Sequence, residues 1–165
     1  MPEIPRFRAT AILRELCDHG VQFIVAGGVA AVLEGVPVNT FDLDVVHSRA
    51  PDNIGRLLAA LDSLGAIYRT QPELARKPDR SHLESSGHQL LTTRFGPLDM
   101  LGAIGRSRGY DDLLPHAHEV AVGEGLRVHV LDLETLIAVK EEVGGEKDLA
   151  VLPIMRRTLE EKQRR

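Results

Sequence analysis

Two aspartates at alternate positions of a short apolar segment are the residues of this chain best suited to metal chemistry. The segment reads Phe41-Asp42-Leu43-Asp44-Val45-Val46, and its apolar residues are typical of a β-strand. Side chains of a strand alternate between its two faces, so Asp42 and Asp44 share one face. Two adjacent carboxylates repel each other unless a cation lies between them. The doublet predicts a divalent-metal site. The alternative is that Asp42 ends a loop and Asp44 faces solvent on a half-exposed strand.

A glycine pair upstream of the doublet is suited to holding an anion. The apolar segment Phe23-Ile24-Val25-Ala26 runs into Gly27 and Gly28, followed by small residues typical of a helix. Glycines let backbone N–H groups approach an anion closely, and a helix N-terminus favours negative charge. This stretch therefore predicts a phosphate cradle next to the metal site.

A third carboxylate, Asp99, stands between Leu98 and Met100 in another predicted strand. Aspartate is a poor strand former, and burying its charge is costly without a compensating partner. A pair of Mg²⁺ ions would compensate all three carboxylates, with Mn²⁺ as an alternative ion. We expect Asp42 and Asp44 to bridge the metals. Asp99 would complete the ion beside the acceptor and help to take its proton.

Together these motifs resemble the pattern of the nucleotidyltransferase superfamily. That pattern is a hydrophobic residue and a glycine pair, then an Asp-x-Asp strand, then a later strand aspartate. The motifs that match are Ala26-Gly27-Gly28, Asp42-Leu43-Asp44-Val45 and Pro97-Leu98-Asp99-Met100. The likeness is greatest to the small prokaryotic branch that includes the toxin nucleotidyltransferases of toxin–antitoxin pairs, to which Thr40 also conforms. It covers about residues 21–155.

The resemblance implies a fold and a reaction. The fold would be α/β (α+β), with a nucleotidyltransferase-like mixed β-sheet flanked by helices and with C-terminal helices. The donor would be a nucleoside triphosphate whose terminal phosphates Gly27 and Gly28 hold, and pyrophosphate would be the leaving group. Thr40, Lys140 and Lys147 would join the glycines in binding the nucleotide.

Lys140 is also singled out by its place in a helix. It falls within the apolar stripe that Leu133, Leu136, Ile137 and Val143 define. A lysine in such a stripe commonly extends its ammonium to the surface. The alternative is that Lys140 points across the sheet toward a triphosphate, as the similar lysine of the family does. Lys147-Asp148 resembles a Lys-Asp pair of the family, although Asp148 also suits a helix N-terminus by its charge alone.

Length and composition predict one soluble globular domain over residues 1–165. The core would span about residues 21–131 and a helical part about residues 132–165. The 165 residues are 43% hydrophobic and 27% charged, with a net charge of −4, which argues against non-specific coating of nucleic acid. No apolar run is long enough to span a membrane. The lone Cys17 excludes an internal disulfide, so we expect a cytoplasmic protein in which Cys17 packs in a helix.

Hydrophobic periodicity predicts alternating helices and strands. We expect a long loop at residues 69–87, and a last helix whose Leu149, Leu152, Met155 and Leu159 face inward. The predicted helices are residues 7–19, 27–34, 51–64, 133–143 and 146–162. The predicted strands are residues 21–26, 41–47, 66–68, 88–95, 97–101, 118–122 and 127–131, the last two forming a hairpin.

The functional prediction is a metal-dependent nucleotidyltransferase that moves a nucleoside monophosphate to a hydroxyl acceptor. The acceptor could be an RNA 3′ end (tRNA included), a protein or a small molecule, and a cognate antitoxin is a further candidate partner. A non-catalytic partner- or nucleic-acid-binding protein on the same scaffold is the main alternative, and a metal-dependent phosphohydrolase is another. His116 and His118 lack the neighbours that a zinc site needs.

Overall fold

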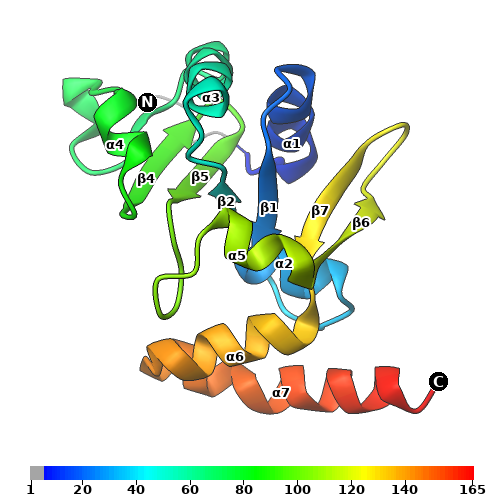
Figure 1. Ribbon diagram of the computed structural model, residues 1–165. Helices are drawn as coiled ribbons and strands as arrows, with labels where there is room; N and C mark the ends of the chain where they lie inside the picture. The colour runs from blue at the N-terminus through cyan, green and yellow to red at the C-terminus, as the bar shows by residue number, and fades with distance from the viewer. Residues whose placement is uncertain (1–5) are drawn as a thin grey trace.

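The apolar segments of the sequence form the centre of a seven-stranded mixed sheet, with the strand order β3-β4-β5-β2-β1-β7-β6 (Figure 1). The computed structural model describes residues 6–165. Three strands at the centre, β1, β2 and β5, are almost wholly buried. The strands are β1 Phe23–Ala26, β2 Leu43–His47, β3 Ile67–Tyr68, β4 His88–Thr93, β5 Gly96–Leu101, β6 Ala117–Ala121 and β7 Arg127–Leu131.

The helices agree closely with the predicted ones. Asp132 caps α6, as expected for a residue before a helix, because its side chain accepts a hydrogen bond from Thr135 N–H at 2.8 Å. Gly144, with φ of 68°, ends the same helix. The helices are α1 Ala9–Asp18, α2 Gly27–Leu33, α3 Pro51–Ser63, α4 Arg80–Glu84, α5 Tyr110–Leu113, α6 Leu133–Val143 and α7 Glu146–Gln163, with short 3₁₀ turns at Pro72–Leu74 and Leu114–His116.

The register of the central strands aligns the functional candidates in one row. β1 pairs antiparallel with β2, which places Ala26 opposite Asp44. β2 pairs parallel with β5, which places Asp44 opposite Asp99. β4 pairs antiparallel with β5, which places Leu90 opposite Asp99. Two carboxylates from distant parts of the chain are therefore direct cross-strand neighbours, an arrangement that repels.

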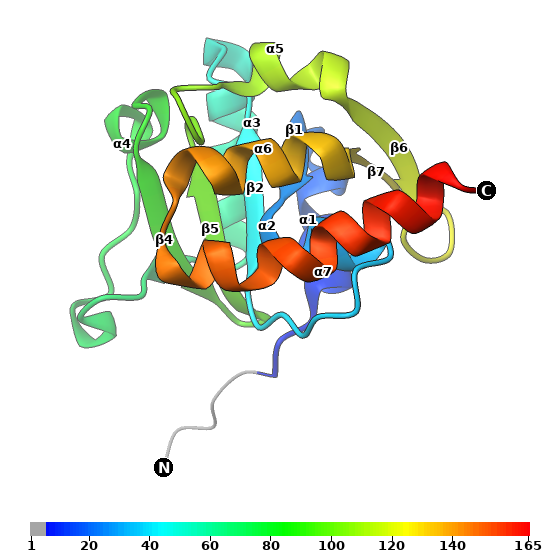
Figure 2. The same cartoon turned by 90° about the horizontal axis from the view of Figure 1, so that it is seen from below.

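The two C-terminal helices, α6 and α7, lie side by side below the sheet in Figure 1. Seen from below, they extend across the strands that carry the aspartates (Figure 2). Leu136 and Ile137 of α6 and Leu152 and Met155 of α7 are buried. α1 packs against α3 on the opposite side of the strands, at the top of Figure 1.

Two predictions from periodicity were wrong in detail. Residues 69–87 are not all loop, because α4 and a 3₁₀ turn form within them; Asp79 starts α4 by accepting a hydrogen bond from His82 N–H at 3.0 Å. Leu149 does not face inward and is 51% exposed. The buried side of α7 is formed by Leu152, Met155 and Thr158, and Leu149 lies in the first turn, before this stripe begins.

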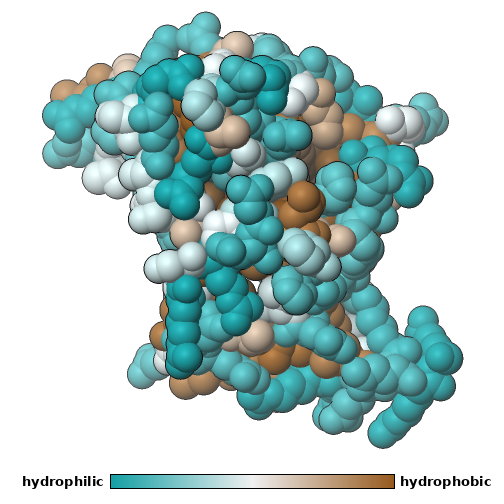
Figure 3. Space-filling view, viewed as in Figure 1, coloured by the Kyte–Doolittle hydropathy of each residue, from teal (hydrophilic) through white to brown (hydrophobic). Residues whose placement is uncertain are grey.

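The surface is largely polar, with apolar patches over α6 and α7 at the bottom of Figure 3. The exposed apolar residues of these helices are Val143 and Leu149. Within residues 6–165, no helix has both the length and the apolar character needed to cross a membrane.

Candidate active site

The structure brings Asp42, Asp44 and Asp99 together. One carboxylate oxygen from each lies within 4.8 Å of the other two. Among residues 6–165, they form the one group of three or more His, Cys, Asp or Glu side chains close enough to share a metal ion. Asp42 lies directly before β2 rather than inside it, since β2 begins at Leu43.

Two oxygens of this cluster have no hydrogen-bond partner among the described residues. Asp44 Oδ1 and Asp99 Oδ1 are both buried and accept no hydrogen bond, although the charge of Arg69 lies near Asp99 Oδ1. A buried polar atom without a partner costs roughly 1–3 kcal/mol, and more when it is charged. The cluster is therefore destabilising unless a ligand from outside the chain satisfies it.

Two of the carboxyl groups, those of Asp44 and Asp42, resist ionisation in the absence of such a ligand. Burial, together with the charges of Asp42 and Asp99, raises the pKa of Asp44 to about 8. Burial and then Asp99 raise the pKa of Asp42, while Arg69 opposes the change. A bound cation would reverse these shifts, because it favours the charged form of each carboxyl.

Glycine is required at the end of β1 because Asp44 occupies the space of a side chain there. Gly27 has φ of 61°, and a β-carbon on it would lie 2.8 Å from Cγ of Asp44. At Gly28 a β-carbon would lie 2.6 Å from Oγ1 of Thr40. The Thr40 hydroxyl in turn donates to the Asp42 carbonyl at 3.1 Å. The predicted glycine pair thus packs directly against the predicted carboxylate doublet.

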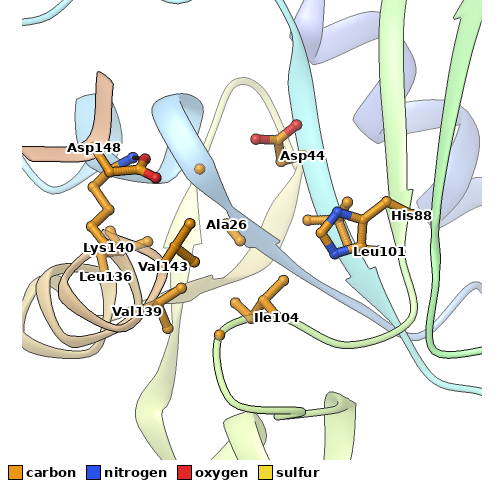
Figure 4. A pocket seen from close by; sticks show the side chains of 12 residues that line it. Ala26, Asp44, His88, Leu101, Ile104, Leu136, Val139, Lys140, Val143 and Asp148 are labelled. Atoms are coloured by element: carbon orange, nitrogen blue, oxygen red, sulfur yellow. Dashed lines mark hydrogen bonds and ion pairs between the residues drawn. The ribbon is translucent and has the colours of Figure 1, made fainter. Parts of the chain in front are cut away.

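Lys140 reaches the site and pairs with Asp148. Its Nζ lies 3.0 Å from Asp148 Oδ1, which links α6 to α7. The lysine and its partner lie together on one wall of a pocket that Asp44 overlooks, with His88 and Leu101 on the opposite wall (Figure 4). Lys140 therefore does not simply extend to the outer surface.

This pocket is compact and mainly apolar. It has a volume of about 200 Å³. Its apolar lining includes Ile104 and Val139 (Figure 4), and Gly27 and Asp44 border it at the sheet.

A second, wider pocket of about 570 Å³ lies on the other side of the Lys140–Asp148 pair. Its lining is rich in cations and includes the other members of the predicted nucleotide site. The lining residues are Asn39, Thr40, Phe41, Asp42, Arg69, Pro97, Lys140, Lys147, Asp148 and Val151. Asp42 thus borders the cationic pocket, whereas Asp44 borders the apolar one.

Two residues of the site were not assigned by the sequence. Arg69 Nη1 lies 3.0 Å from Asp99 Oδ1, and the sequence indicated only that its segment is basic. Phe41 is 76% exposed beside Asp42, although its position in an apolar strand segment predicts burial. The sequence signal that could have identified it is an aromatic residue directly before the first aspartate of the doublet.

No protein-family model matches this sequence, and it has no match among curated proteins. Solved structures do match. The antibiotic-resistance factor ANT(2'')-Ia aligns over 91% of this chain and 81% of its own, with a TM-score of 0.59 and 18% identity. The lincosamide antibiotic adenylyltransferase LnuA, solved with lincomycin bound, aligns over 92% of this chain and 98% of its own, with a TM-score of 0.59 and 13% identity.

A candidate nucleotidyltransferase from Thermotoga maritima aligns over 92% of this chain and 90% of its own, with a TM-score of 0.57 and 17% identity. At such identities the likeness concerns the fold. The chain has the same fold as these three structures, which confirms the fold that the resemblance implied.

Proposed function

We propose that this protein transfers a nucleoside monophosphate from a nucleoside triphosphate to a hydroxyl group of a small molecule. The observation that carries the proposal is the partly buried cluster of Asp42, Asp44 and Asp99, in which two buried oxygens accept no hydrogen bond, in a nucleotidyltransferase fold. Such a cluster destabilises the protein and is best explained as the binding site of a divalent cation. The Thr40, Lys140 and Lys147 side chains around it suit a polyphosphate.

The residues present fit Mg²⁺, which prefers carboxylate oxygens and shares its coordination with substrate phosphates. We propose that Asp42, Asp44 and Asp99 hold two such ions, with Mn²⁺ as a substitute. When bound, the ions would neutralise charge on the transferred group and lower the pKa of the attacking hydroxyl. Because Gly27 has no side chain, the Asp44 carboxylate can occupy the space beside it, where it could bind the metal ions together with Asp42 and Asp99.

The donor nucleotide fits the wider, cationic pocket. Lys140, Lys147 and Arg69 line it, and their charges oppose those of a triphosphate. Gly27 borders the adjoining apolar pocket rather than this one; we propose that it and Gly28 contact phosphates that extend from the wider pocket toward β1, as the resemblance implies. The exposed ring of Phe41 lies at the same pocket and offers a stacking surface for the nucleobase.

In the reaction, the acceptor oxygen forms a bond to the α-phosphorus, and the bond between that phosphorus and the β-phosphate oxygen breaks. Pyrophosphate leaves with the electron pair of the broken bond. The hydroxyl proton passes to a carboxylate, for which we propose Asp99. Reactions of this kind depend mainly on positioning and charge neutralisation, so few residues suffice.

The apolar pocket favours a small acceptor. Its volume of about 200 Å³ suits one ring system better than a macromolecule, and Asp44 borders it beside the reaction centre. Two structural neighbours are complexes with antibiotics or their adenylylated forms, lincomycin and adenylyl-2''-tobramycin. An RNA 3′ end, a protein acceptor, a toxin role and an antitoxin partner stay predictions from the sequence.

A non-catalytic binding protein on this scaffold is the second candidate. Loss of catalysis would remove the reason to keep three mutually repelling carboxylates, since replacing one would relieve the raised pKa of Asp44. All three carboxylates and both glycines are present, which favours the enzyme.

The decisive experiment is transfer of label from each of the four α-labelled triphosphates in the presence of Mg²⁺. Acceptors are tested in three separate groups: a panel of hydroxylated antibiotics, total RNA and total protein. Asp44→Asn is the inactive variant, and Asp62→Asn is its control, because Asp62 is an exposed carboxylate paired only with the surface residue Lys77.

Label on a small molecule, with release of pyrophosphate, is expected from the wild type and the control but not from Asp44→Asn. Label on RNA or protein instead would support the proposed transferase activity but contradict the proposal of a small-molecule acceptor. No transfer to any group, with no binding of triphosphate by calorimetry, would leave the binding protein as the better account.

A further inference from the structure

Arg69 places a positive charge at the carboxylate cluster. Its Nη1 lies 3.0 Å from Asp99 Oδ1, and the Asp99 side chain is only 11% exposed. The contact is an ion pair without an aligned hydrogen bond, since Asp99 Oδ1 has no hydrogen-bond partner among the described residues. The arginine therefore neutralises charge while leaving this oxygen available to another ligand.

The position of Arg69 is determined by the strand next to Asp99. The backbone N–H of Arg69 donates to the Leu90 carbonyl at 2.9 Å, and its Nη1 donates to the Leu91 carbonyl at 2.9 Å. Leu90 is the register partner of Asp99. The first hydrogen bond fixes the backbone of Arg69 on β4, and the second holds its guanidinium beside the carboxylate without involving the carboxylate.

The loop that follows Arg69 is tied at its ends and contains strained residues. Tyr68 N–H donates to the Arg76 carbonyl at 2.8 Å, which closes the loop. Gln71 and Ala75 have φ of 55° and 48°, a left-handed conformation that is unfavourable for residues other than glycine. Strain of this kind persists where the surrounding structure holds the chain in place, and here it adjoins the residue that contacts Asp99.

The charges of the site then match one divalent ion. When all three carboxylates are ionised, as metal binding requires, Arg69 cancels one of their three negative charges. Lys140 contributes little net charge because Asp148 lies 3.0 Å from it. Two negative charges are left, the charge of a single divalent cation. A second cation would have no net negative charge to bind to unless an anion, such as a triphosphate, were also bound.

We propose that Arg69 is a positioning residue that acts as the resident cation of the cluster. It holds Asp99 toward Asp42 and Asp44, and it limits the nucleotide-free site to one divalent ion. The second ion enters only with the triphosphate, whose charge then compensates both. This inference rests on the proposed function, because it assumes a site that takes a nucleotide and metal ions.

The test is the number of Mn²⁺ ions bound per chain, measured by calorimetry and by electron paramagnetic resonance of free Mn²⁺. Wild type, Arg69→Gln, Arg69→Lys and Arg76→Gln are compared with and without a non-transferable ATP analogue that has a methylene group between the α- and β-phosphorus. Arg76 is the matched control, an exposed arginine on the same loop. Thermal unfolding of each variant shows whether it is folded.

We expect one Mn²⁺ without the analogue and two with it for the wild type and for Arg76→Gln. Arg69→Gln should bind a second Mn²⁺ without the analogue, or bind the first about tenfold or more tightly, because the variant removes a positive charge that repels the metal ion at short range. Arg69→Lys keeps the positive charge, so the number of Mn²⁺ ions that it binds should be close to that of the wild type.

Two ions on the nucleotide-free wild type, or an Arg69→Gln variant that is less stable but has unchanged Mn²⁺ binding, would overturn the inference. If no protein binds Mn²⁺ even with the analogue present, the proposed function fails as well. If Arg69→Gln binds one ion without the analogue and two ions with it, as the wild type does, only the role of Arg69 is refuted.

Discussion

At the scale of single residues, Gly27 shows how the site depends on a missing side chain. It has φ of 61°, and a β-carbon there would meet Asp44. Gly65 offers a matched comparison, because its φ is 66° and nothing lies within 4 Å of the position of a β-carbon. Both glycines therefore adopt a left-handed backbone conformation, but only at Gly27 would a β-carbon clash with another side chain.

Gly27→Ala should destabilise the protein more than Gly65→Ala. Gly65→Ala should cost about 1–2 kcal/mol through its left-handed conformation alone, and Gly27→Ala should cost about 1–3 kcal/mol more because Asp44 must shift. Urea denaturation measures both. Gly27→Ala should also weaken Mn²⁺ binding, whereas Gly65→Ala should not; equal effects of the two variants would contradict a role for the clash.

The Asp44 carboxyl makes stability depend on pH in the metal-free protein. Its pKa is raised from 3.8 to about 8, so between these pH values the folded state keeps a proton that the unfolded state has lost. Folding stability therefore falls as pH rises through this window. Below about pH 4 both states are protonated, and the penalty disappears.

Asp44→Asn should consequently stabilise the metal-free protein at pH 7.5 while removing transfer activity. We expect a gain on the order of 2 kcal/mol at pH 7.5 and almost none at pH 4. Urea denaturation with a chelator present measures the gain at each pH, and Asp62→Asn serves as the control. A variant that is less stable than the wild type at pH 7.5 would show that the carboxyl contributes to folding without metal.

At the scale of elements, α6 and α7 place a cation between the two pockets. Lys140 on α6 pairs with Asp148 on α7. A second ion pair, Arg156–Glu141 at 2.8 Å, joins the same two helices but is about half exposed. The first pair borders both pockets, while the second lines neither.

Lys140→Met should weaken triphosphate binding about tenfold or more, because a charge-assisted contact to phosphate contributes roughly 1.5–3 kcal/mol. Arg156→Met should leave binding unchanged, since an exposed ion pair contributes about 0–1 kcal/mol. Calorimetry with ATP and Mg²⁺ measures both. A similar loss in the two variants would mean that Lys140 acts only by holding the helices together.

At the scale of the whole molecule, the carboxylate cluster couples metal binding to folding. The three aspartates come from the segment before β2, from β2 and from β5, so the complete site exists only in the folded chain. A ligand that binds only the folded state stabilises it by about 2.7 kcal/mol at a concentration of 100 times its Kd.

Mn²⁺ at that excess should raise the Tm by about 5–10 °C in a chain of this size, and a chelator should remove the increase. Differential scanning calorimetry at pH 8 is the measurement. The shift should be lost in Asp99→Asn and kept in Asp62→Asn. A shift of the same size in both variants would place the bound metal elsewhere.

Most of the fold could be predicted from the sequence because helices and strands depend on local patterns. The strand of Phe23 to Ala26, the cap at Asp132 and the bounds of α6 follow from neighbouring residues alone. Leu149 was mispredicted because helical spacing shows a stripe but not where the partner surface ends. The strand predicted at residues 41–47 starts two residues later, at Leu43, because Phe41 and Asp42 lie outside the sheet.

The sequence by itself determined which carboxylates and glycines are candidates for the chemistry. The spacing of Asp42 and Asp44, and a glycine pair after a buried strand, can be recognised without any distant partner. Only the tertiary structure decided that Arg69 meets Asp99, that Lys140 pairs with Asp148, and that two pockets of different character flank the carboxylates. These features depend on the register between strands and on the packing of α6 and α7, contacts between residues far apart in the chain that no local pattern encodes.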